Sequence, residues 1–234
     1  MKRLLDILLA SLGLLVFLPI LLLFILLIWI QDFKSPFYRA LRIGKGGKKF
    51  NMYKLRSMEV NSDRSGVEST SNDDARITKI GLFIRSSKMD ELSQLWNVLI
   101  GNMSIVGPRP NTPNGVSVYT NLEMELISIK PGITDISSIV FSDEGEVLLG
   151  RRDPDIAYNE LIRPWKSRLG LLYIQNQSLL LDLKLILFTS IAIYNKQKAL
   201  NYINVVLQRI SDNSELIKVC KREEDLYPAS PPGL

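Results

Sequence analysis

Residues 86–99 have the sequence SSKMDELSQLWNVL, and the rest of the chain is organised around this segment. Its leucines and its tryptophan recur at helical spacing, which predicts a helix with one buried face. Ser87 and Asp90 have the spacing of an N-terminal capping box, and Gly101 is a suitable residue to end the helix. We therefore expect one helix that begins near Ser87 and carries Asp90 and Glu91 in its first turn.

Asp90 and Glu91 are the first candidates for chemistry. Free backbone amides and the helix dipole favour negative charge at a helix start, and Arg85 and Lys88 lie just upstream. Two adjacent carboxylates beside two cations would form a site that also suits an anionic ligand. The plainer interpretation is that both acids only stabilise the helix start, and the local sequence by itself favours it.

The next stretch, residues 102–110, has the sequence NMSIVGPRP and places Arg109 between Pro108 and Pro110. A proline on each side restricts the backbone, so the Arg109 guanidinium is presented at a fixed place. An arginine held in this way is well suited to bind a phosphate or a carboxylate with two hydrogen bonds.

Three motifs occur here in a fixed order: Asp-Glu-Leu, Leu-Trp-Asn-Val-Leu and Val-Gly-Pro-Arg-Pro. Together they closely resemble the bacterial monotopic phosphoglycosyl transferases, the sugar transferases that start the synthesis of lipid-linked glycans. The resemblance runs from Lys2 to about Lys196 and includes the segment SLLLDLKLI at residues 178–186. Within that segment Asp182 either orients a basic residue of the active site or is an ordinary acidic helix start.

The composition limits the classes of function. The chain has 234 residues, enough for one compact domain plus a membrane element. It has no histidine, which excludes histidine acid–base catalysis and histidine metal sites. Its single cysteine, Cys220, excludes an internal disulfide and a cysteine metal cluster. A net charge of +5 suits a partner that carries phosphate groups.

The first thirty residues are almost wholly apolar, and the plain interpretation is a single-pass transmembrane helix. Two features favour a different geometry. Pro19 lies in the middle of the apolar run, where it breaks helical hydrogen bonding, and basic residues flank the run on both sides. We expect a re-entrant helix that bends at Pro19 and leaves the membrane by the face it entered. The resembling family usually has Ser-Pro at this break, whereas this chain has Leu18-Pro19.

The segment between the membrane helix and Ser86 contains further cations. Residues 42–50 are glycine-rich but lack the ending of a phosphate-binding P-loop, so we predict a tight turn between two short strands. The second strand then carries Lys54 and Arg56, which alternation places on one face. The family has a similar run here, which makes both residues candidates for binding substrate phosphate. Residues 61–74 are polar and predict a surface loop that could form a lid.

We predict an α/β fold that is mainly helical. A re-entrant, Pro-broken membrane helix (residues 1–33) precedes a small cytoplasmic catalytic domain with short strands and interfacial helices (residues 34–197). A C-terminal helix and a disordered tail (residues 198–234) follow. The apolar stripe of the C-terminal helix suits a membrane surface or a partner subunit, so a homo-oligomer is among the expected states. The charged, turn-rich residues 143–155 are assigned no chemistry.

The resemblance implies transfer of sugar-1-phosphate from a UDP-sugar to polyprenyl (undecaprenyl) phosphate, at the cytoplasmic face of the bacterial inner membrane. The products would be a polyprenyl diphosphate sugar and UMP, as the first step of capsule, O-antigen, exopolysaccharide or glycoprotein glycan assembly. Asp90 would be the nucleophile that forms a covalent phosphosugar intermediate, and Glu91 would hold Mg²⁺. Phosphate would be bound by Arg85, Arg109, Lys54 and Arg56. Pro108, Pro110 and Asp182 would support these residues.

A non-catalytic membrane scaffold or regulator of a glycan assembly complex is the alternative. Residues 133–138 depart from the family, where Pro-Gly-Ile-Thr is commonly followed by glycine and a glutamine, and this leaves the sugar undefined. The phospholipid membrane is an expected partner in either case. Nucleic acid is not, because a membrane anchor and the absence of clustered base-stacking aromatics argue against it.

Overall fold

The structure is a computed structural model of the chain, and it describes residues 1–62 and 69–234. Part of the loop that we predicted as a lid, residues 63–68, lies outside the described residues. The long helices are α1 (Lys2–Asp32), α8 (Arg163–Asn176), α9 (Leu179–Tyr194) and α10 (Lys196–Ile210). Shorter helices are α2 (Lys79–Ser86), α3 (Gln94–Leu99), α4 (Pro113–Ser117), α5 (Ile136–Val140), α6 (Glu144–Val147), α7 (Pro154–Ala157) and α11 (Ser214–Lys221).

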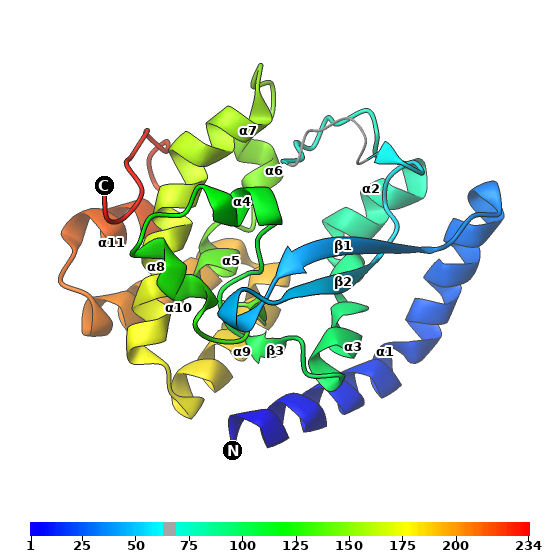
Figure 1. Cartoon of the computed structure of the whole chain (residues 1–234), viewed down its shortest axis with the longest axis horizontal. Helices are drawn as coiled ribbons and strands as arrows, with labels where there is room; N and C mark the ends of the chain where they lie inside the picture. The colour runs from blue at the N-terminus through cyan, green and yellow to red at the C-terminus, as the bar shows by residue number, and fades with distance from the viewer. Residues whose placement is uncertain (63–68) are drawn as a thin grey trace.

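Strands make a small contribution. They are β1 (Phe37–Ile43), β2 (Lys49–Leu55), β3 (Ser104–Val106) and β4 (Gly132–Thr134). The described residues also form the short helical turns η1 (Lys45–Gly47), η3 (Met89–Glu91), η4 (Glu123–Ile127) and the π-helical η5 (Tyr158–Ile162). The mainly helical character is as predicted. In Figure 1 the helices α8, α10 and α11 gather on one side, α1 runs along the opposite edge, and the hairpin β1–β2 crosses between them.

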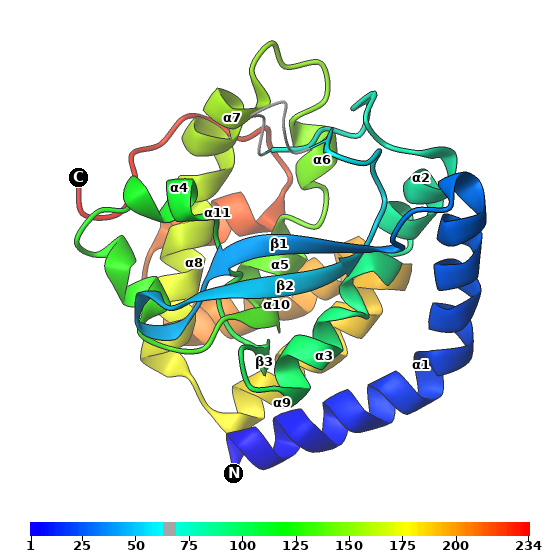
Figure 2. The same ribbon diagram turned by 45° about the vertical axis from the view of Figure 1, so that its right-hand side comes forward.

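Helix α1 is long and apolar enough to cross a membrane. It contains Pro19 and is bent in the middle, so that its two halves follow two edges of the domain (Figure 2). Polar side chains fasten its first two turns. Arg3 donates to the carbonyls of Val98 and Leu99 at 2.5 and 2.7 Å, and Asp6 accepts from the amide of Ile105 at 2.9 Å.

The other end of α1 is also bonded to the domain, because Asp32 forms an ion pair with both terminal nitrogens of Arg56. Near the first end, Nζ of Lys2 lies 2.5 Å from Oδ2 of Asp182, and Oδ1 of Asp182 accepts from the hydroxyl of Tyr173 at 2.6 Å. Helix α1 is therefore held at both ends by the same domain.

The two sheets are small and position the site from opposite sides. The hairpin β1–β2 is antiparallel, with Ile43 opposite Lys49, which confirms the predicted turn. Gly46 and Gly47 have φ values of 66° and 79° within that turn, a conformation that glycine adopts without strain. Strands β3 and β4 are parallel. Their ends pack so closely that a Cβ on Gly132 would lie 2.1 Å from the amide nitrogen of Gly107.

The central segment differs from the single helix that we predicted. Helix α2 continues to Ser86, and the hydroxyl of Ser87 donates to the carbonyl of Phe83, so Ser87 closes α2 and caps no new helix. Lys88 then has a left-handed φ of 57°, which turns the chain into η3 before α3 begins. The predicted end at Gly101 is confirmed, with a φ of 91°.

The buried face of this segment also differs from the prediction. The predicted stripe included the tryptophan, but Trp96 is 52% exposed and α3 buries Asn97 and Val98 instead. Asn97 accepts from the amide of Tyr53 at 2.9 Å and donates to the carbonyl of Asn51 at 2.7 Å. Its amide side chain thus joins α3 to the edge of β2.

The main core lies among α5, α8, α9 and α10 and includes Trp165, Tyr173 and Leu185. The apolar stripe of α10 was predicted to face a membrane or a partner subunit, and that prediction was wrong. Leu200, Ile203, Val206 and Leu207 are buried in this core. The apolar stripe of α10 is present, but it packs against the core of the same chain.

The end of the chain carries a second helix, α11, that we did not predict. Residues 223–234, which we predicted as a disordered tail, contain no helix or strand and contact the domain. Ala229 donates to the carbonyl of Glu160 at 3.1 Å, and the ring of Tyr227 lies 5.4 Å from that of Trp165.

A buried ion pair connects η4 to α8. Oε2 of Glu123 lies 2.5 Å from Nη2 of Arg163, and its Oε1 accepts from the hydroxyl of Ser167 at 2.6 Å. Both charged side chains are within the protein, at 0% and 9% exposure. Removing one partner of such a pair is costly, because the other would remain as a buried, unpaired charge.

We expect Glu123→Ala to destabilise the fold by about 3–5 kcal/mol, because the Arg163 guanidinium would remain buried without its carboxylate. Thermal unfolding in detergent would measure the loss. The matched control is Glu125→Ala on the same turn, where the side chain is exposed, and its effect should stay within about 0.5 kcal/mol. Equal effects of the two substitutions would contradict the structural role of the pair.

Candidate active site

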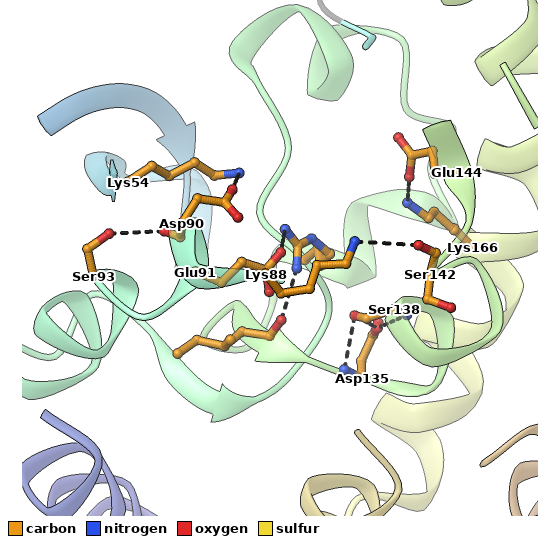
Figure 3. A network of polar contacts seen from close by, with 12 residues as sticks. Lys54, Lys88, Asp90, Glu91, Ser93, Asp135, Ser138, Ser142, Glu144 and Lys166 are labelled. Carbon is orange, nitrogen blue, oxygen red and sulfur yellow. Dashed lines mark hydrogen bonds and ion pairs between the residues drawn. The ribbon is translucent and has the colours of Figure 1, made fainter. Parts of the chain in front are cut away.

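A cavity of about 1190 Å³ opens between the hairpin, η3, the loop after β3 and the helices α5, α6 and α8. Most of the residues proposed from the sequence line it: Lys54, Arg85, Asp90, Glu91, Pro108, Arg109 and Pro110. Figure 3 shows part of this network of polar contacts. The cavity therefore gathers residues from segments that are far apart in the sequence.

Asp90 lies at the start of the cavity, in η3. Its Oδ2 lies 3.3 Å from Nζ of Lys54, which projects from β2 (Figure 3). The hydroxyl of Ser93 contacts the carbonyls of Asp90 and Tyr53, at 3.0 Å each, and so fastens η3 against β2. The carboxylate is largely buried, at 7% exposure for the residue, yet it faces the cavity. These contacts fix the direction in which the Asp90 carboxylate points.

Glu91 and Arg109 form the second pair of the site. Nη2 of Arg109 donates to Oε1 of Glu91 at 2.8 Å, and Nη1 donates to the carbonyl of Ile133 at 3.0 Å. Burial opposes ionisation of Glu91, but the charges of Arg109 and Lys54 and the hydrogen bond from Arg109 outweigh it. They lower the pKa of Glu91 to about 2. The charge of Glu91 in turn raises the pKa of Arg109, despite burial. Both groups are charged at neutral pH.

Positive charges stand beside the two carboxylates of η3. Lys54 pairs with Asp90 and Arg109 pairs with Glu91. Arg85 and Lys88 also line the cavity, as do Glu144 and other acidic residues of its far wall. Arg85 lies in the last turn of α2, and its side chain makes no hydrogen bond to the described parts of the chain. Its guanidinium is therefore available to a ligand from this side. Such a cluster can neutralise two phosphate groups brought close together.

Sequence reasoning missed two residues on the opposite wall. Lys166 of α8 forms an ion pair with Glu144 of α6, and both line the cavity (Figure 3). Burial disfavours the charge of Lys166, but Glu144 and Tyr158 outweigh it and raise the pKa of Lys166 to about 12. Glu144 belongs to the segment to which we assigned no chemistry. No local motif marks either residue, since only the fold brings α6 against α8.

Two predicted site residues lie elsewhere. Strand β2 ends at Leu55, and Arg56 pairs with Asp32 of α1. Lys54 lines the cavity and Arg56 does not, so the two side chains do not share a face. Asp182 orients no basic residue of the cavity. Its partners are Lys2 and Tyr173, so it holds the start of α1.

Comparison with known proteins identifies the lineage of this fold and cavity. Residues 1–196 match the family described as bacterial sugar transferase. The chain belongs to this family. Within it, a Bacillus subtilis protein provisionally named an undecaprenyl-phosphate N-acetylgalactosaminyl 1-phosphate transferase is 46% identical over 120 residues, covering 51% of this chain and 67% of the relative.

Two further members of the bacterial sugar transferase family show how coverage varies. A Klebsiella pneumoniae protein named a UDP-glucose:undecaprenyl-phosphate glucose-1-phosphate transferase is 36% identical over 191 residues, covering 80% of this chain but 39% of the relative. EpsL of Bacillus subtilis, named an uncharacterized sugar transferase, is 35% identical over 190 residues and matches 81% of this chain and 85% of its own length. The chain thus spans about two fifths of some relatives and nearly all of another.

The described acidic residues can bind Mg²⁺ only together with the phosphate groups of a substrate. Among residues 1–62 and 69–234 no group of three or more acidic, cysteine or histidine side chains could enclose a metal. Mg²⁺, however, is commonly bound by one or two carboxylates together with substrate phosphates. One carboxylate oxygen of Glu91 accepts a hydrogen bond from Arg109, and its second oxygen has no hydrogen bond to the described residues.

The low pKa of Glu91 predicts a pH-dependent contribution to stability. Its pKa is about 2 in the folded state against an ordinary value of 4.5. The stabilisation is therefore complete above the ordinary pKa and is lost as the pH falls toward 2. We expect the difference in Tm between wild type and Glu91→Gln to shrink between about pH 6 and pH 2. Glu125→Gln is the exposed control, and a wild-type difference that is constant with pH would contradict the prediction.

Proposed function

We propose that this protein is a membrane phosphoglycosyl transferase that moves sugar-1-phosphate from a UDP-sugar to polyprenyl phosphate. One observation carries the proposal: a carboxylate, Asp90, is held in a cavity directly beside a cluster of cations. The names of the relatives from Bacillus subtilis and Klebsiella pneumoniae support the same reaction class. Two anionic substrates must meet in this reaction, and the cations beside Asp90 and Glu91 offset their mutual repulsion.

In the first step, an oxygen of the Asp90 carboxylate attacks the phosphorus that carries the sugar. The bond from this phosphorus to the bridging oxygen of the diphosphate breaks, and that oxygen leaves with the electron pair as part of UMP. An acyl-phosphate links Asp90 to the sugar. Arg109 and Arg85 bind the phosphate oxygens, and Lys54 orients the Asp90 carboxylate before the attack.

In the second step, a phosphate oxygen of the polyprenyl phosphate attacks the same phosphorus. The bond to the Asp90 oxygen breaks, the carboxylate is restored, and the product is a polyprenyl diphosphate sugar. Glu91 would hold Mg²⁺ through its free oxygen, and the ion would offset charge on the diphosphate. Lys88, next to η3, supplies a further positive charge to the cavity.

We propose that α1 is a re-entrant membrane helix and that the catalytic domain lies on the cytoplasmic face of the bacterial inner membrane. A straight helix of this length would extend about 46 Å, more than the roughly 30 Å of a bilayer core, and would separate its two ends. The bend and the bonds of Arg3 and Asp32 to one domain support entry and exit by the same face. The basic flanks support the cytoplasmic side.

Trapping the intermediate tests the role of Asp90. Wild type is incubated without lipid acceptor, with a panel of UDP-sugars that carry radioactive phosphorus in the sugar-linked phosphate. We expect label on wild type that hydroxylamine releases, no label on Asp90→Asn, and a loss of turnover of about 10³-fold or more in that variant. The exposed Asp212→Asn is the control and should label as wild type. Equal labelling of Asp90→Asn would remove Asp90 from this role.

Steady-state kinetics test Arg109. Release of UMP is measured with undecaprenyl phosphate as acceptor and the same panel of UDP-sugars. We expect Arg109→Met to lower kcat/KM by about 10²-fold, because a donor to the transferring phosphate is lost. Arg109→Lys should recover little, since one ammonium cannot replace the forked contacts to Glu91 and Ile133. Failure of wild type to release UMP from any donor would favour the non-catalytic scaffold instead.

A further inference from the structure

The last part of the chain lies outside the family match, which ends at residue 196. Helices α10 and α11 nevertheless share one hydrophobic core with α5, which forms part of the cavity wall. Leu200 and Val219 belong to the same buried cluster as Ile139 and Phe141. The C-terminal helices are therefore packed directly behind residues that line the site.

A polar contact links these helices to the wall. Asp143 lies at the N-terminal end of α6, where an aspartate ordinarily accepts a hydrogen bond from its own helix. Its side chain makes no such bond. Instead Oδ2 of Asp143 lies 2.5 Å from Nζ of Lys196 and 2.9 Å from Nη2 of Arg222. Both partners come from the C-terminal helices, and Asp143 itself lines the cavity.

Arg222 is held tightly at this contact. It ends α11 with a left-handed φ of 55°, and its guanidinium lies 5.5 Å from the centre of the Phe141 ring. The side chain is 11% exposed. Its Nε and Nη1 have no hydrogen-bond partner in the described ranges. A buried arginine with so few partners is kept mainly by its contacts with Phe141 and Asp143.

The residues on each side of Asp143 contact two lysines that line the cavity. The carbonyl of Ser142 accepts from Nζ of Lys88 at 3.4 Å, and Lys88 immediately precedes η3 and Asp90 (Figure 3). The carboxylate of Glu144 pairs with Lys166 on the opposite wall. Three consecutive residues, 142–144, thus connect the catalytic turn, the C-terminal helices and α8.

We propose that Arg222 is a positioning residue of the active site. By holding Asp143 it fixes residues 142–144, and through them the places of Lys88 and Lys166 in the cavity. The C-terminal extension is then a structural part of the site that sets its affinity for a nucleoside diphosphate. This inference rests on the proposed function only for the identity of the ligand, because the contact itself is independent of turnover.

Hydrogen exchange tests the positioning without any enzyme assay. The full chain is compared in lipid nanodiscs as wild type, Arg222→Met, Arg222→Lys and the control Arg209→Met, whose side chain is exposed on α10. In Arg222→Met we expect amide exchange of residues 141–148 to rise about tenfold while that of α8 stays unchanged. Arg222→Lys should lie between, and Arg209→Met should match wild type. Unchanged exchange in residues 141–148 would overturn the proposal.

Ligand binding tests the consequence, with UDP as the probe and calorimetry as the readout. We expect Arg222→Met to weaken UDP binding by about fivefold and Arg209→Met to leave it unchanged. The loss of UDP binding free energy in the double variant Arg222→Met, Lys88→Met should be smaller than the sum of the two single losses. In the double variant Arg222→Met, Lys54→Met it should equal the sum. Additivity in both cases would overturn the proposed connection.

Failure of the proposed function and failure of the positioning role would give different results. If Arg222→Met does not fold, Asp143→Asn replaces it in both measurements, with the same expectations and the same contradicting results. If wild type releases no UMP from any donor but exchange rises locally in Arg222→Met, the proposed function fails and the positioning role stands. Global rather than local acceleration of exchange in both Arg222→Met and Asp143→Asn would assign the contact to general stability and overturn the proposal.

Discussion

The ion pair between Glu91 and Arg109 is the interaction on which the site depends. Asp90 stands on a single short turn that follows a left-handed residue, so no long helix fixes its position. The pair joins that turn to the proline-flanked arginine, which the parallel strands β3 and β4 hold from behind. Arg109 lies beside Glu91 and Lys54 lies beside Asp90, so each cation reduces the repulsion between the two neighbouring carboxylates. Without this bond, η3 and the proline-flanked Arg109 would lose their direct connection across the cavity.

Much of this site could be predicted from the sequence because its parts are marked locally. A pair of acids near a helical turn, and an arginine between prolines, are visible without knowledge of the fold. The predicted turn at residues 42–50 is likewise a local feature, which the hairpin confirms. The mainly helical fold and the long apolar helix follow from periodicity and composition. Glu144 and Lys166 could not be found in this way, since their pairing depends on how α6 meets α8.

The predictions that were wrong fail for related reasons. Periodicity correctly found an apolar stripe on α10, but it does not say which surface covers the stripe, and the covering surface is the chain's own core. Alternation placed Lys54 and Arg56 together, but the strand ends between them and Arg56 finds an acid on α1. The helix expected from Ser87 begins only after Lys88, because Lys88 takes a left-handed conformation that spacing alone does not reveal. In the first two cases a partner distant in sequence decides the outcome.

Attachment of α1 at both of its ends has a mechanical consequence under the proposed membrane placement. A domain on one tether can swivel about it, whereas two separated attachment points remove most of that rotation. The mouth of the cavity would keep a constant height and heading above the lipid headgroups. A lipid substrate then reaches the cavity by diffusion in the plane of the membrane, and the cavity mouth keeps a constant orientation toward it.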